Sequence, residues 1–355
     1  MRKLTFVLAL VLVMSLLAGC VGTPVVVNCT CPTEGEESPT VPATEPVVVE
    51  GAVKTGLAIT AKVTGENASA DAVGKVEYDV TMVAVLVDEN GVIVDCVIDS
   101  LGTSVVFDAA GAVTTDLTAA IQTKNELGEN YGMKAYGGAK FEWNEQAAAL
   151  ASYAKGKTLE ELKTGAVNES GYAADVDLAA SATIYLGGYV AAIEKAVNNA
   201  RHLGAQGGDK LVLASTASLG STTAADAENA GNAQLDCDVT AMTMKGDVIS
   251  SCVIDSLQAK VAFDATGAIT SDLTAPVQTK NELGENYGMK AWGKATYEWN
   301  EQAASFAAYV TGKTAAEVAG IAVNEKTAPT DADLAASVTI AIGGFQALIA
   351  KGANQ

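Results

Sequence analysis

Apolar residues dominate the segment 77–87, Glu-Tyr-Asp-Val-Thr-Met-Val-Ala-Val-Leu-Val, and its richness in β-forming residues predicts a β-strand. The segment 88–91, Asp-Glu-Asn-Gly, is typical of a turn, and the apolar residues 92–98 that follow it predict the returning strand of a hairpin. A third strand is expected at 103–108. Together these segments predict a small antiparallel sheet.

Helical periodicity begins after the predicted sheet. The apolar residues of 143–154 fall on one face of a helix. Thr158 and Glu161 have the spacing of a capping box, which predicts a short helix beginning at that point. The expected fold class is therefore α+β, a small antiparallel sheet with packed helices.

The pattern then repeats along the chain. Residues 96–195 align with residues 252–351 without a gap, and 63 of the 100 positions are identical. The longest shared run has 14 residues, starting at Gln122 in the first copy. A period this long indicates a duplicated domain rather than a solenoid. The sequence therefore predicts two tandem modules, at residues 52–203 and 204–355.

The N-terminal segment has a different character. Arg2 and Lys3 precede a short apolar run that ends in Leu-Ala-Gly-Cys, with the cysteine at position 20. This order resembles the signal peptide and lipobox of bacterial lipoproteins, which implies removal of residues 1–19 and a lipid on Cys20. Residues 20–51 are rich in Pro, Thr and Glu without periodicity, as expected for a tether. The prediction is a chain anchored to a membrane rather than spanning it.

Charge and composition exclude several functions. The chain has 42 acidic and 22 basic residues, a formal net charge of −20, and a single histidine. Nucleic acid is not an expected partner, because few basic groups are present to neutralise phosphates. One histidine cannot supply a Ser-His-Asp triad or a histidine-ligated metal site to each of two modules, and no zinc spacing occurs. No catalytic residue and no metal ligand is therefore assigned.

A short motif occurs at corresponding positions in both copies. An aspartate is followed four residues later by a serine, and two residues after that by a threonine; Gly-Gly-aromatic and an apolar helix come next. The motif residues are Asp177, Ser181 and Thr183 in the first copy and Asp333, Ser337 and Thr339 in the second. This resembles the flavinylation motif of the FMN-binding domain family, in which a flavin transferase links FMN to the threonine through a phosphoester. The resemblance implies covalent FMN on Thr183 and Thr339, two per chain. In both copies serine stands where the family motif has glycine.

Further residues can be assigned to the same site. A threonine at the start of a helix would present its hydroxyl outward, where free amide groups favour a phosphate. Aromatic and thioether side chains in the shared run are candidate contacts of the flavin ring: Tyr131 and Met133, repeated as Tyr287 and Met289. Trp143 and Trp299 are expected mainly as core residues of a helix face.

Other residues present in both copies have structural interpretations. Asp99 and Asp255 are expected to form turns. Cys237 and Cys252 either form a disulfide or are buried inert thiols.

The order of lipobox, tether and two modules resembles the flavin lipoproteins of Gram-positive extracellular electron transfer. The resemblance implies an electron carrier, rather than a substrate-turnover enzyme, on the extracytoplasmic face of the cell membrane. Its implied partners are the membrane, a flavin transferase, an upstream membrane redox donor and an extracellular acceptor. Two alternatives stay open: a surface lipoprotein that binds a small ligand non-covalently without flavin, and a structural surface lipoprotein.

Overall fold

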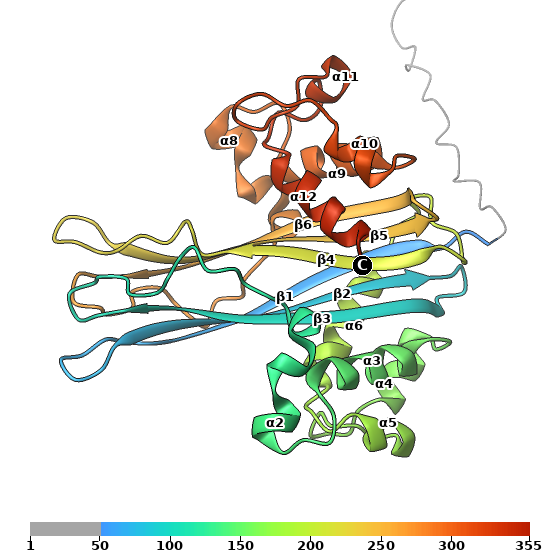
Figure 1. Ribbon diagram of the computed structural model, residues 1–355, viewed down its shortest axis with the longest axis horizontal. Coiled ribbons are helices and arrows are strands. Elements are labelled where there is room, and N and C mark those ends of the chain that lie inside the picture. Colours follow the sequence, from blue (N-terminus) through green and yellow to red (C-terminus); the bar gives the residue numbers. More distant parts are fainter. Residues whose placement is uncertain (1–50) are drawn as a thin grey trace, which may run out of the picture. The chain divides into compact units, whose positions relative to one another are not determined.

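The computed structural model describes residues 51–355. The expected signal peptide, Cys20 and all but the last residue of the expected tether lie outside the described residues. Within them the α+β prediction is confirmed, because two three-stranded antiparallel sheets are each packed against helices (Figure 1).

Each sheet is an antiparallel meander of three long strands. The first comprises β1 (Lys54–Glu66), β2 (Gly74–Val87) and β3 (Ile93–Phe107). The second comprises β4 (Lys210–Ser218), β5 (Gly231–Lys245) and β6 (Val248–Phe263). The hairpin predicted around residues 88–91 joins β2 to β3.

The helices follow the sheet in each half of the chain. In the first half they are α1 (Lys124–Leu127), the 3-10 helix η1 (Gly128–Tyr131), α2 (Met133–Gly137), α3 (Trp143–Ala154), α4 (Leu159–Gly165), α5 (Val176–Ser181) and α6 (Gly187–Asn199). In the second half they are α7 (Lys280–Leu283), η2 (Gly284–Tyr287), α8 (Met289–Gly293), α9 (Trp299–Val310), α10 (Ala315–Ala319), α11 (Ala332–Ala335) and α12 (Gly343–Ala353). The helix predicted over 143–154 is α3, and the predicted capping box opens α4.

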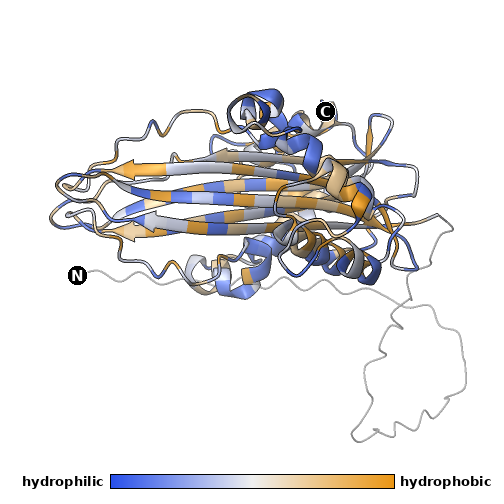
Figure 2. Ribbon diagram, turned by 90° about the horizontal axis from the view of Figure 1, so that it is seen from below, coloured by the Kyte–Doolittle hydropathy of each residue, from blue (hydrophilic) through white to orange (hydrophobic). Residues whose placement is uncertain are grey.

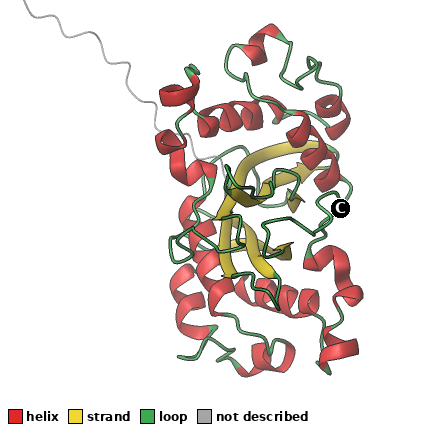
Figure 3. Ribbon diagram, turned by 90° about the vertical axis from the view of Figure 1, so that its left-hand side faces the viewer, coloured by secondary structure: helices red, strands yellow, loops and turns green. Residues whose placement is uncertain are grey.

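The two sheets face one another and share a core. One cluster of buried apolar residues includes side chains from all six strands, among them Val80 of β2 and Leu257 of β6. Phe107 and Phe263 stack across the cluster with ring centroids 4.1 Å apart. Helices α3 and α6 cover the outer face of the first sheet, and α9 and α12 cover that of the second (Figures 1 and 3). Hydropathy accordingly varies along each strand, with apolar residues in contact with both cores (Figure 2).

Matching ion pairs join the two halves. Lys195 on α6 pairs with Glu282 at 2.7 Å, and Lys351 on α12 pairs with Glu126 at 2.5 Å. Glu126 and Glu282 are corresponding residues of the shared 14-residue run. The identity of the run at this glutamate therefore has a structural cause, in addition to any role of the run in a site.

The predicted break between a second and a third strand is wrong. Residues 103–107 form the far end of β3, and Asp108 directly follows it. The expectation that Asp99 forms a turn is also wrong, because Asp99 lies within β3 and is 8% exposed. Its Oδ1 accepts hydrogen bonds from the backbone N–H of Ser100 at 2.7 Å and of Asn125 at 3.1 Å. Asp255 has the same setting in β6. Aspartate usually favours turns. Here a hydrogen bond from an asparagine distant in sequence holds it inside a strand.

Asp255 should make the stability of the fold depend on pH. Burial raises the pKa of its carboxyl from 3.8 to about 6. The folded state then binds this proton more tightly than the unfolded chain, so stability falls as the pH rises from about 4 to about 6. The fall should be no more than about 3 kcal/mol, since one pKa unit corresponds to about 1.4 kcal/mol. Asp255→Asn keeps an acceptor oxygen but cannot ionise, and should flatten this part of the profile in urea denaturation. Asp108 lies in the turn after β3, where its Oδ1 accepts from the N–H of Ala110 at 2.8 Å. An unchanged profile, or an equal change in Asp108→Asn, would contradict the assignment.

The cysteines of the described residues are free thiols: Cys96, Cys237 and Cys252. Cys237 lies in the core between the sheets, whereas Cys252 lies in the core beneath the helices of the second module. The two side chains therefore lie on opposite faces of one sheet, and the buried-thiol alternative holds. Burial raises the pKa of Cys96 and Cys252 to about 12, so both stay protonated at neutral pH.

Candidate functional site

Thr183 and Thr339 are exposed and lie in short loops between two helices of their own module. The expectation that each stands at the start of a helix is wrong, because α6 begins only at Gly187 and α12 at Gly343. In the first module α5 ends when Ala182 takes extended backbone angles, and Thr183 follows it. The threonines are therefore presented by a loop and not by a helix N-terminus.

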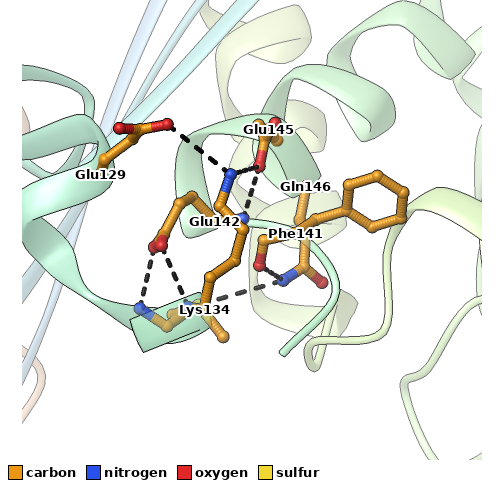
Figure 4. Close-up of polar contacts among 7 residues, drawn as sticks. Glu129, Lys134, Phe141, Glu142, Glu145 and Gln146 are labelled. Atoms are coloured by element: carbon orange, nitrogen blue, oxygen red, sulfur yellow. Dashed lines mark hydrogen bonds and ion pairs between the residues drawn. The ribbon is translucent and has the colours of Figure 1, made fainter. Parts of the chain in front are cut away.

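A buried glutamine fixes this loop. Gln146 on α3 has no exposed surface. Its Oε1 accepts hydrogen bonds from the N–H of Thr183 at 2.8 Å, the N–H of Ile184 at 3.1 Å and the hydroxyl of Thr183 at 3.2 Å. Its Nε2 donates to the carbonyl oxygen of Phe141 at 3.0 Å (Figure 4). One side chain thus satisfies two backbone donors and orients the threonine hydroxyl.

The second module repeats this arrangement. Gln302 on α9 accepts from the N–H of Thr339 at 2.8 Å and from its hydroxyl at 3.1 Å. In both modules the hydroxyl proton points to the glutamine. The oxygen lone pairs are left for other partners, on a residue that is exposed.

A buried carboxylate holds the segment that carries Tyr131 and Met133. Glu142 is 2% exposed and accepts hydrogen bonds from the N–H of Met133 at 2.8 Å and of Lys134 at 3.0 Å (Figure 4). Glu145 completes the capping box by accepting from the N–H of Glu142 at 2.6 Å, and it also pairs with Lys134 at 3.2 Å. The start of α3 thereby positions this segment.

A cavity of about 590 Å³ opens beside the threonine loop of the first module. Ile184, which directly follows Thr183, is part of its lining, and so is Gly188 on α6. Both ring-contact residues predicted for this module, Tyr131 and Met133, also line it. The rest of the wall includes Lys62, Asp79, Thr81 and Ser100 from the sheet and Lys124, Trp143 and Tyr189 from the helices.

A lysine lies between two aromatic rings of this wall. The Nζ of Lys124 is 5.2 Å from the ring centroids of both Tyr131 and Trp143, which is cation–π distance. The indole N–H of Trp143 donates to the hydroxyl of Tyr189 at 3.0 Å. Trp143 is only 3% exposed, so it is mainly a core residue that also closes one side of the cavity.

The second module keeps the lysine and the rings. Lys280 lies 5.2 Å from the ring of Tyr287 and 5.0 Å from that of Trp299. Tyr287 and Met289 are half-buried against the core beneath the helices. The two sites are therefore built on one plan.

The serines and aspartates of the motif make local contacts instead of lining the cavity. Ser181 Oγ donates to the carbonyl oxygen of Asp177 at 3.1 Å, within α5. Asp177 is exposed in the first turn of that helix, whose N-cap is Asp175. Ser337 and Asp333 lie at the corresponding places at α11.

Sequence reasoning missed Gln146 and the lining residues of the strands. Gln146 carried a signal, because it is a polar residue on the apolar face of α3 and is kept as Gln302. The sequence contains no such signal for Thr81 and Lys62, because only the register between strands brings them to the cavity.

Comparison with protein-family models, with curated proteins and with solved structures gives no match. None of the helices in residues 51–355 has the length and apolar character needed to cross a membrane. Within the same residues, His, Cys, Asp and Glu side chains form no group of three or more that could hold a metal ion.

Proposed function

We propose that this protein is a membrane-anchored, extracytoplasmic electron-transfer flavoprotein that carries covalent FMN on Thr183 and Thr339. The main support is the exposed threonine of a flavinylation-like motif, held by a buried glutamine in both modules. A flavin transferase has to reach such a hydroxyl, and a fixed loop lowers the entropic cost of presenting it. In the first module a cavity adjoins this threonine.

The residues present fit a flavin mononucleotide. The cavity of about 590 Å³ is within the roughly 300–1,000 Å³ usual for ligand sites. Tyr131 and Trp143 offer aromatic contacts, and Lys62 and Lys124 offer positive charge for a phosphate or an electron-rich ring. A Cβ built on Gly188 would meet a single neighbour, at 3.9 Å, so any side chain there would project into the free space. FMN supplies the electron transfer, and the protein binds it, orients it and sets the surrounding charge.

A lipid on Cys20 would anchor the chain, and the tether would let the modules move between a membrane redox donor and an extracellular acceptor. The flavin transferase is the third protein partner.

The decisive experiment is intact-mass measurement after coexpression with a flavin transferase. We expect the wild-type chain to gain two flavinyl groups, and Thr183→Ala and Thr339→Ala to gain one each. Thr183→Ser and Thr339→Ser keep a hydroxyl on the same loop and serve as matched controls.

Other outcomes favour the alternatives. A chain that gains no mass while the transferase labels a control substrate would contradict covalent attachment, and the serine in place of glycine would be the first cause to test. A small molecule other than flavin, released on denaturation, would then support the non-covalent ligand-binding lipoprotein. Absence of any bound molecule would support the structural lipoprotein.

A further inference from the structure

The two modules differ at one sheet position of the candidate site. Thr81 of β2 lines the cavity of the first module. Strand register places Asp238 of β5 at the corresponding position of the second sheet. Its Oδ2 is 3.4 Å from where a Cβ would stand on Gly344, the counterpart of the cavity residue Gly188. A carboxylate in the second module therefore replaces a hydroxyl in the first.

A second difference changes the charge in the same direction. Lys62 lines the cavity of the first module, and its register counterpart is the uncharged Ser218. Asp79 and Lys124 keep their charges in the second module, as Asp236 and Lys280. The first site thus has two cations and one anion, and the second has one cation and two anions. The two sets of side chains differ by two unit charges.

The two carboxylates of the second site are held in place. The amide groups of Gln234 and Gln258 donate to Asp236 at 2.8 and 3.0 Å. Asp238 is half-buried and lies opposite Ser256 of β6 in the strand register. Burial raises the pKa of Asp238, while Ser256 and the positive charge of Lys280 lower it. These negative groups are built into the sheet and are not mobile surface charges.

We propose that the FMN of the second module has a lower reduction potential than the FMN of the first. This inference rests on the proposed function. Negative charge near a flavin opposes the addition of electrons, and positive charge favours it. An electron exchanged between the two groups oxidises the FMN of the second module and reduces that of the first, so no further reactant is needed. The equilibrium constant of this exchange favours the first module by about tenfold or more, the effect of one unit charge in a partly buried site.

Single-flavin variants of the full-length chain test the proposal. Thr339→Ala leaves FMN on the first module only, and Thr183→Ala leaves it on the second only. In spectroelectrochemical titrations we expect the higher potential in Thr339→Ala. Exchanging the residues at this one position should narrow the difference: Thr81→Asp lowers the potential of the first module, and Asp238→Thr raises that of the second. Asp238→Asn, which removes the charge and keeps the shape, should act like Asp238→Thr.

Mass measurement of the same samples distinguishes a failure of the proposed function from a failure of this inference alone. Chains without covalent flavin overturn the proposed function and this inference with it. Single-flavin variants that each carry their FMN, but at equal potentials or in the reversed order, overturn this inference alone. So do chains whose potentials do not respond to Thr81→Asp, Asp238→Thr and Asp238→Asn.

Discussion

Phe107→Ala should lower the free energy of unfolding by about 3–5 kcal/mol, the usual cost of removing a fully buried phenylalanine side chain. Phe107 has no exposed surface and stacks on Phe263 with an interplanar angle of 6°. Its loss leaves a cavity between two sheets, and the helices on the outer faces cannot close it. Guanidinium denaturation followed by circular dichroism measures the change.

The same variant tests whether the two modules unfold together. Because the Phe107–Phe263 contact joins both sheets, we expect one cooperative transition that shifts as a whole. In a double-mutant cycle with Phe263→Ala, the two changes should not add. Tyr136→Ala, at a side chain that is 91% exposed, is the matched control and should change stability by less than about 0.5 kcal/mol. Two separate transitions, of which Phe107→Ala shifts only one, would show that the modules are energetically independent.

Local features of the fold could be predicted because their causes lie within a few residues. The hairpin at 88–91 follows from turn residues between apolar runs, and α3 and α4 follow from helical spacing and the capping box of Thr158. The duplication also allowed each element to be expected twice. The α+β class required no more than these local signals.

Features that depend on contacts distant in sequence could not be predicted. Asp99 has the local chemistry of a turn residue, but the N–H of Asn125 binds it inside a strand. The packing of one sheet on the other depends on which side chains of each strand point into the core between the sheets. The register between neighbouring strands decides which side chains these are. The shared run pointed to two residues of the cavity wall, Tyr131 and Met133, whereas the wall residues that the strands supply were missed.

Glu142→Ala should lower the free energy of unfolding by about 3–6 kcal/mol, because two backbone N–H groups each lose a charge-assisted hydrogen bond worth about 1.5–3 kcal/mol. The groups are the N–H of Met133 and of Lys134. Their amide protons should exchange faster with solvent, which NMR or mass spectrometry detects. Glu142→Gln keeps one acceptor oxygen and should lose less. Unchanged exchange at Met133 and Lys134 would contradict this role.

The same substitution separates the attachment of FMN from the orientation of its ring. The threonine loop is held by Gln146, whereas the wall that carries Tyr131 and Met133 is held by Glu142. Glu142→Ala should therefore leave the flavinyl mass on Thr183 unchanged, provided the variant is folded at the temperature used. The visible circular dichroism of the flavin of the first module should weaken, since its ring would have lost a fixed wall. Thr339→Ala as background removes the signal of the second module, and Glu298→Ala in that background is the matched control. A loss of mass together with the dichroism would instead show that the transferase recognises the wall as well as the loop.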